Sequence, residues 1–86
     1  MLGVWIPMNQ EEIEDMMNAV REGRIFTMRK LIDAQEPGIY ESADYNGKRK
    51  IAHKYNKKLT YLKKHEYVKQ IGMDPIRKTA FWIAIR

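Results

Sequence analysis

The stretch from Lys48 to His65 is the part of this sequence that most restricts the fold. Its apolar residues follow one another at steps of four, four and three, namely Ile51, Tyr55, Leu59 and Leu62. Because such steps keep side chains on one side of an α-helix, they predict a helix of about eighteen residues with one buried side. The remaining positions are largely basic. We therefore expect a helix that belongs to the core and also presents a basic surface to solvent.

The composition permits one small globular domain, residues 1–86. A chain of 86 residues leaves no room for a second hydrophobic core, and a hydrophobic content of 44% is enough to close a modest one. Cysteine is absent and the two histidines are a poor ligand set alone, so we expect no disulfide, no metal and no other cofactor. No apolar run approaches the roughly 18 residues of a membrane span, and no signal-peptide pattern opens the chain. These features predict a cytoplasmic protein with no membrane partner.

Charge is divided unevenly along the chain. Residues 1–45 carry four basic and nine acidic side chains, a net charge of −5, whereas residues 46–86 carry twelve basic and two acidic ones, a net charge of +10. Such a division inside one small domain builds a positive face that attracts polyanions and keeps repulsive acids away from it. A solvated lysine-rich helix beside an acidic one is the alternative explanation. Charge alone does not decide between the two.

Two shorter helices are predicted before the basic one. Asn9, followed three residues later by a glutamate, resembles a capping box at the start of the first helix, and Gly23 is placed to end it. Residues 24–26 form a short extended piece, after which Thr27 is expected to cap a second helix that ends before Pro37. The expected buried positions of the two helices are Ile13, Met16, Met17, Val20, Met28, Leu31 and Ile32.

The other segments are predicted as loops and strands. Residues 35–47 have an irregular pattern and are assigned to a loop, with a small hairpin around Asn46 and Gly47 as one alternative. Residues 67–73 and 79–85 are rich in β-branched and aromatic residues, and a turn signal at residues 74–75 separates them, so they predict a terminal hairpin. Residues 2–6 are expected to form either a further strand or a strap across the helices.

The order of these elements resembles that of winged helix-turn-helix domains. The end of the third helix and the start of the wing match in Leu59, Leu62, Tyr67 and Val68, and the wing matches in Lys69, Asp74-Pro75, Arg77-Lys78 and the returning strand Phe81–Ile85. Residues 24–27 followed by Leu31 resemble the short strand that leads into helix two. Two features depart from the pattern: Glu66 stands where a glycine is common, and the link between helices two and three is long. The resemblance covers about residues 10–85 and implies an α+β fold of three helices with a C-terminal hairpin wing.

This resemblance also implies that the chain binds double-stranded DNA, with the third helix in the major groove and the wing on the adjacent backbone or minor groove. If the apolar side of the helix faces inward, Lys50, His53, Lys54, Lys57 and Tyr61 must face outward. The residues assigned mainly to phosphates are Lys48, Lys57, Lys58, Lys63, Lys64, Arg77 and Lys78. The candidates for contacts to base edges are Arg49, Lys50, His53, Lys54 and Asn56.

The leading interpretation is a sequence-specific DNA-binding protein, a small transcriptional regulator of the kind found in bacterial, archaeal, viral or plasmid genomes. The alternative is a winged-helix module that binds and modulates a protein partner, such as a polymerase or nuclease subunit. RNA binding is a third alternative, and the scarcity of exposed aromatic residues in the basic helix argues against stacking on single strands. We expect no catalytic activity, because no histidine or glycine-rich loop stands near the acidic cluster of residues 11–15. The oligomeric state is left open, with a homodimer on a palindromic site as one alternative.

Overall fold

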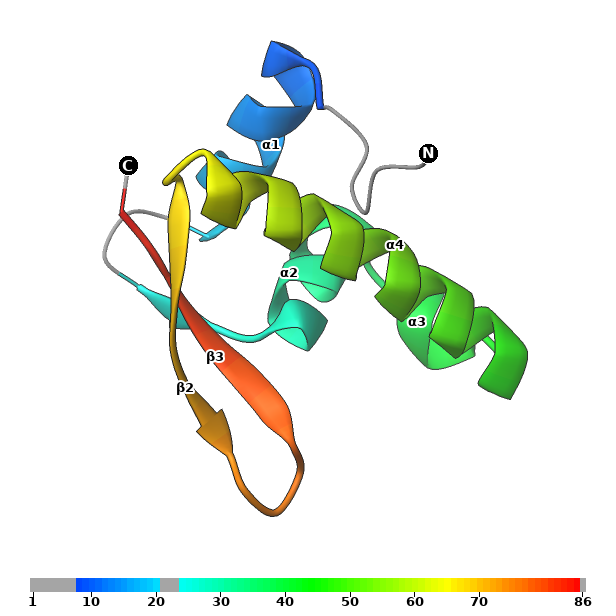
Figure 1. Ribbon diagram of the computed structural model, residues 1–86. Helices are drawn as coiled ribbons and strands as arrows, with labels where there is room; N and C mark the ends of the chain where they lie inside the picture. Colours follow the sequence, from blue (N-terminus) through cyan, green and yellow to red (C-terminus); the bar gives the residue numbers. More distant parts are fainter. Residues whose placement is uncertain (1–7, 21–23, 86) are drawn as a thin grey trace, which may run out of the picture.

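The computed structural model describes residues 8–20 and 24–85, and in this part the chain folds into four helices and a three-stranded antiparallel sheet (Figure 1). The elements in chain order are α1 (Gln10–Val20), β1 (Ile25–Phe26), α2 (Met28–Gln35), α3 (Ile39–Ser42), α4 (Tyr45–Lys64), β2 (Val68–Asp74) and β3 (Thr79–Ala84). The α+β class is confirmed. The predicted strand or strap at residues 2–6 and the predicted helix end at Gly23 lie outside the described residues.

The first two helices begin where their capping residues predict. The backbone N–H of Glu12 donates to Asn9 Oδ1 at 2.8 Å, and the backbone N–H of Lys30 donates to Thr27 Oγ1 at 3.2 Å. Each cap satisfies one of the free N–H groups at a helix start, where no backbone carbonyl is in reach. Both predicted caps are therefore confirmed.

The predicted hairpin around Asn46 and Gly47 is wrong. Both residues lie in the first turn of α4, which begins at Tyr45 rather than at Lys48. The cause is Asp44, whose Oδ1 accepts the backbone N–H of Gly47 at 2.7 Å. An aspartate in this position caps a helix, and the cap prevails over the turn preference of the Asn-Gly pair.

The predicted loop between the second helix and the basic helix contains the short helix α3. Gly38 precedes it with φ of 83°, a left-handed backbone conformation that a glycine adopts at little cost. α3 packs against α2 and α4 and carries the chain from the end of one to the start of the other. The sequence predicted three helices, and the described residues form four.

The predicted terminal hairpin is confirmed as β2 and β3. The sheet order is β1-β3-β2, so the last strand lies in the centre and pairs with both others. Phe26 is opposite Trp82, and Val68 is opposite Ala84, with an irregularity between Gln70 and Gly72. The hairpin extends away from the helices, as Figure 1 shows. Its turn therefore lies at the end of an arm.

The buried side of α4 forms the centre of the core. Tyr55, Leu59 and Leu62 are each about 1% exposed, as predicted from their spacing. Ile51 was expected to be buried with them but is only partly so. Tyr61 was expected to face outward, yet it packs against the core, and the centre of its ring lies 4.2 Å from the centre of the His65 ring. The other buried hydrophobic residues are Met8, Ile13, Met16, Val20, Phe26, Leu31, Ile32, Val68, Trp82 and Ala84.

Replacing either buried leucine of α4 tests this core. Leu59→Ala and Leu62→Ala should each lower the free energy of unfolding by about 2–5 kcal/mol, because each leaves a cavity that the neighbours fill only in part. Lys63→Ala, at an exposed position of the same helix, should change it by less than about 0.5 kcal/mol. Urea denaturation of the three variants measures the difference. A Lys63 variant that unfolds as easily as the leucine variants would contradict this packing.

A residue other than glycine adopts the left-handed backbone conformation just after the C-terminus of α4. Glu66 has φ of 61°. Its N–H donates to the carbonyl of Lys63 at 3.1 Å, and the N–H of Tyr67 donates to the carbonyl of Leu62 at 2.9 Å. This pair of bonds is the Schellman motif, in which glycine is preferred at the position of Glu66. The departure seen in the sequence is therefore a strained backbone position in the fold.

Glu66→Gly should raise the free energy of unfolding by about 0.5–1 kcal/mol, because glycine removes the clash between Cβ and the backbone at positive φ. Glu66→Ala is the matched control, since it removes the carboxylate but keeps Cβ and should give no gain. Thermal and urea denaturation of both variants provide the measurement. Equal stabilisation by alanine would mean that charge, not backbone strain, is the relevant property.

Candidate nucleic-acid interface

The basic residues of the second half of the chain lie on α4 and on the β2–β3 hairpin. With 20 residues, α4 is about 30 Å long and crosses the molecule from α3 to the start of β2 (Figure 1). Because Tyr55, Leu59 and Leu62 point into the core, the solvent side of the helix has two flanks. One flank faces α1, and the other faces the start of α2 and the hairpin. The two flanks differ in charge.

The flank facing α1, the paired flank, holds lysines that meet acids from the first half of the chain. Lys54 Nζ lies 3.5 Å from Glu36 Oε2, and Lys58 Nζ lies 3.6 Å from Glu12 Oε2. The sequence had assigned Lys54 to base edges and Lys58 to phosphates. In the fold both lysines have a carboxylate beside them, which lowers the positive potential on this side of the helix.

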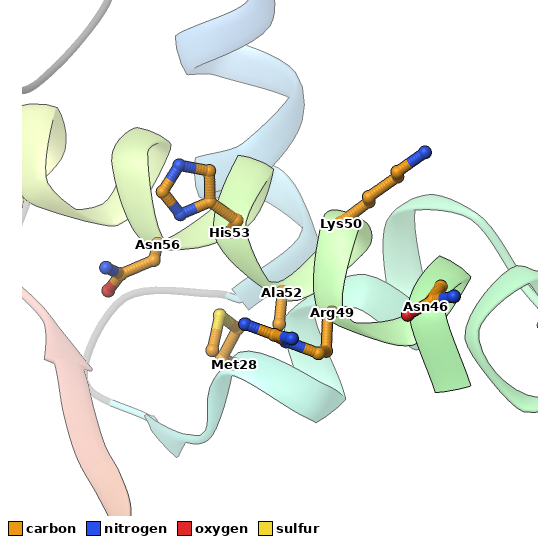
Figure 2. Close-up of a pocket in the computed structure, with 7 residues that line it drawn as sticks. All are labelled: Met28, Asn46, Arg49, Lys50, Ala52, His53 and Asn56. Carbon is orange, nitrogen blue, oxygen red and sulfur yellow. The ribbon is translucent and has the colours of Figure 1, made fainter. Parts of the chain in front are cut away.

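The opposite flank, the open flank, is hollowed. An open hollow of about 800 Å³ lies between α4 and the first residue of α2, and Figure 2 draws the residues that line it. Arg49 and Asn56 project from α4 on the side where Met28 lies, while Lys50 points away from Met28. The full lining is Met28, Asn46, Arg49, Lys50, Ala52, His53 and Asn56.

This hollow continues toward the hairpin. A second hollow of about 320 Å³ shares Met28, Ala52 and Asn56 with the first and is also lined by Lys78 and Met73 of the hairpin. Asn56 and Lys78 are far apart in the sequence but border the same concave surface. The tertiary structure thus joins the basic helix and the hairpin into one site.

The open flank contains cations and no acid among its lining residues. Arg49 and Lys50 border the first hollow, and Arg29 and Lys78 border the second. None of the described residues that line either hollow is an aspartate or a glutamate, and Arg29 is paired with Asp33 outside the lining. A concave surface with charges of one sign focuses the electrostatic potential and attracts ligands of the opposite sign. The open flank is therefore suited to a polyanion.

The remaining predicted site residues lie around this surface. Lys50 and His53 also line a hollow on the paired flank, together with Lys57, so they form the ridge between the two flanks. Lys48 is half-buried, with its Nζ 5.6 Å from the centre of the Tyr40 ring. The other three are exposed, at the C-terminal end of α4 (Lys63, Lys64) and on the hairpin (Arg77).

Sequence reasoning missed Met28, Arg29 and Met73 at this surface. The guanidinium of Arg29 is held by Asp33, with Nε 3.1 and 3.2 Å from its two carboxylate oxygens, and Arg29 Cζ lies 4.6 Å from the centre of the Tyr40 ring. The predicted cap at Thr27 did place Met28 and Arg29 in the first turn of a helix. No pattern in the sequence indicated that this turn would lie beside α4.

The turn of the hairpin is fixed by its own side chain. Asp74 Oδ1 accepts the backbone N–H of Ile76 at 2.9 Å and that of Arg77 at 3.2 Å. These two bonds hold the pKa of Asp74 below its usual value. Lys78 closes the turn with φ of 55°, and its N–H donates to the carbonyl of Asp74 at 2.7 Å. Three hydrogen bonds to Asp74 thus hold the backbone of the turn.

Among residues 8–20 and 24–85, no group of three or more histidine, aspartate or glutamate side chains is arranged to hold a metal ion. No helix in the same part of the chain is long and apolar enough to cross a membrane. Comparison of the chain with protein-family models, with curated proteins and with solved structures finds no match. A functional assignment therefore depends on the geometry and charge of this surface.

A part-buried hydrogen bond joins α4 to the end of α2. Tyr55 Oη donates to Glu36 Oε2 at 2.6 Å. This bond, with a further contribution from the neighbouring Lys54, lowers the pKa of Glu36 below its usual 4.5, and burial together with the same bond raises the pKa of Tyr55. Because the pKa of Glu36 is lower in the folded than in the unfolded chain, its contribution to stability is present above pH 4.5. That contribution is lost as the pH falls through the folded pKa.

Tyr55→Phe should lower the free energy of unfolding at pH 7 by about 1 kcal/mol, a value reduced because Glu36 is partly exposed. The variant should also lose less stability than the parent between pH 7 and pH 3, since the ionised carboxylate no longer gains the bond. Tyr45→Phe is the control, because Tyr45 lies exposed in the first turn of α4. Urea denaturation at several pH values measures both effects. An unchanged acid dependence in the Tyr55 variant would contradict the assigned role of the bond.

Proposed function

We propose that this chain is a winged helix-turn-helix protein that binds double-stranded DNA. In this proposal the N-terminal half of α4 enters the major groove, and the β2–β3 hairpin is the wing that contacts the adjacent backbone or minor groove. The element order and the sheet order β1-β3-β2 are compatible with that fold. An additional helix, α3, occupies the link between the helices that correspond to the helix-turn-helix pair.

The observation that carries the proposal is the open flank. It combines one side of a helix, the first turn of a second helix and a hairpin in a single concave surface with four cations and no acid among its lining residues. Of these four cations Arg29 is paired with Asp33. On the other flank Glu12 and Glu36 pair with two lysines of α4 itself. A duplex is a polyanion wide enough to touch the helix and the hairpin at once, because its major groove, about 12 Å wide, admits an α-helix.

The chemistry of the side chains divides their roles. Arg49 and Asn56 can make paired hydrogen bonds, arginine to guanine and asparagine to adenine, so we assign them to base edges. Lys50, Lys57 and Lys78 are assigned to phosphates, which they contact without reading sequence. Binding of this kind is sequence specific, and the biological role that we propose for it is the regulation of transcription.

The salt dependence of binding tests the proposal directly. With the three phosphate contacts assigned to Lys50, Lys57 and Lys78, a plot of log K against log salt concentration should have a slope of about −2.7 for one protein molecule on random duplex DNA. Fluorescence anisotropy of a labelled duplex, at several potassium chloride concentrations, provides the measurement. Absence of binding to any duplex at low salt would exclude this function.

Two double variants with equal loss of charge separate the two flanks. Arg49→Ala with Lys50→Ala should lower duplex affinity by about tenfold or more and reduce the steepness of the slope by about 1, since Lys50 is the one of the two that is assigned to a phosphate. Lys54→Ala with Lys58→Ala removes the same charge from the same helix, but from the paired flank. It should reduce the steepness by less than about 0.5. Equal effects of the two double variants would show that only total charge matters and that the open flank is not the binding surface.

A further inference from the structure

The end of the hairpin exposes apolar side chains. Ile76 is 89% exposed, and Pro75 beside it is exposed as well. Both residues lie in the turn between β2 and β3, at the end of the arm that extends away from the helices (Figure 1). A single exposed isoleucine is common on protein surfaces. Ile76 differs from such a residue because it lies at the end of a projecting hairpin whose turn is held by hydrogen bonds.

The turn holds its own backbone in a fixed arrangement. Both N–H groups of residues 76 and 77 bond to the carboxylate of Asp74, and the N–H of Lys78 bonds to its carbonyl. A backbone segment that is already ordered loses little conformational freedom when it binds. The turn thus presents the exposed Ile76 from a backbone that need not rearrange on binding.

The surroundings of Ile76 indicate the chemistry of that site. Arg77 and Lys78 follow it in the turn and are exposed cations. Asp74 is the acid of the turn, and its Oδ1 is occupied by the two backbone bonds. Lys78 also borders the hollow shared with α4, so the arm is continuous with the open flank. An apolar tip next to two cations fits a ligand with an apolar interior and an anionic exterior.

We infer that Pro75 and Ile76 form a wedge that enters the minor groove and partly unstacks one base step, so that the protein bends the DNA it binds. The inference rests on the proposed function and extends it. The faces of stacked bases are the apolar surface that a duplex offers, and apolar side chains inserted from the minor groove kink it. Pyrimidine–purine steps are the least costly to open. Arg77 and Lys78 would meet the phosphates on either side of the opened step.

Ring closure of short DNA tests the wedge without knowledge of the target sequence. A linear duplex of about 100 base pairs with cohesive ends is shorter than the persistence length of DNA, so ligase closes it poorly unless a protein bends it. The wild-type protein should raise the rate of ring closure by about tenfold or more at saturating concentration. Affinity for the same fragment is measured in parallel by gel shift.

The variant Ile76→Ala should bind this fragment within about threefold of wild type, because its phosphate contacts remain, but should lose most of the ring closure. Ile76→Met keeps an apolar side chain at the tip and should therefore retain the promotion of ring closure. Ile85→Ala makes the same substitution at an exposed isoleucine beyond the end of β3, away from the turn, and should behave as wild type. Ring closure by Ile76→Ala equal to wild type would overturn the wedge.

The results also separate the wedge from the function on which it rests. If the wild-type protein binds the fragment but does not promote ring closure, the wedge is wrong and DNA binding stands. If it binds no duplex at all, the proposed function fails with it. Light scattering of wild type and Ile76→Ala without DNA tests a protein partner for the tip: a wild-type dimer that Ile76→Ala dissociates would overturn the wedge in favour of self-association.

Discussion

Tyr55, Leu59 and Leu62 pack into the centre of the core, and this packing fixes the rotation of α4 about its own axis. Every other surface of the molecule follows from that rotation. A helix turns by 100° for each residue, so a change of one position in the buried set would turn one of the two flanks toward the core. The hydrogen bond from Tyr55 to Glu36 adds a polar constraint to the apolar ones. Together they hold the helix in one register against α2.

The charge division of the sequence becomes a division between the two flanks of one helix. The acids of the first half of the chain do not spread evenly around α4. Glu12 on α1 and Glu36 at the end of α2 lie beside Lys58 and Lys54, whereas Arg29 is the paired one of the four cations that line the open flank, with Asp33. Exposed pairs of this kind contribute little to stability. Their main consequence is to neutralise part of the positive charge on the paired flank.

The hairpin is also anchored in this core, through buried residues of β3. β3 lies in the centre of the sheet, with Trp82 and Ala84 buried, so the base of the arm is anchored while its turn extends into solvent. The turn does not rely on that core, because Asp74 supplies its own hydrogen bonds. The turn at the end of this arm holds both Ile76 and Lys78, and Lys78 also borders the open flank.

Local signals in the sequence determined the caps at Asn9 and Thr27, the buried stripe of α4 and the terminal hairpin, because each depends on residues a few positions apart. Local signals failed at residues 46–47, where the neighbouring Asp44 caps a helix instead of allowing a turn. The candidate site was predicted as a list of basic residues on α4 and the hairpin. Only the tertiary structure divided that list into two flanks, since the division depends on where α1, α2 and the hairpin lie around α4. Those positions come from contacts between residues distant in the chain, and periodicity within one helix contains no information about them.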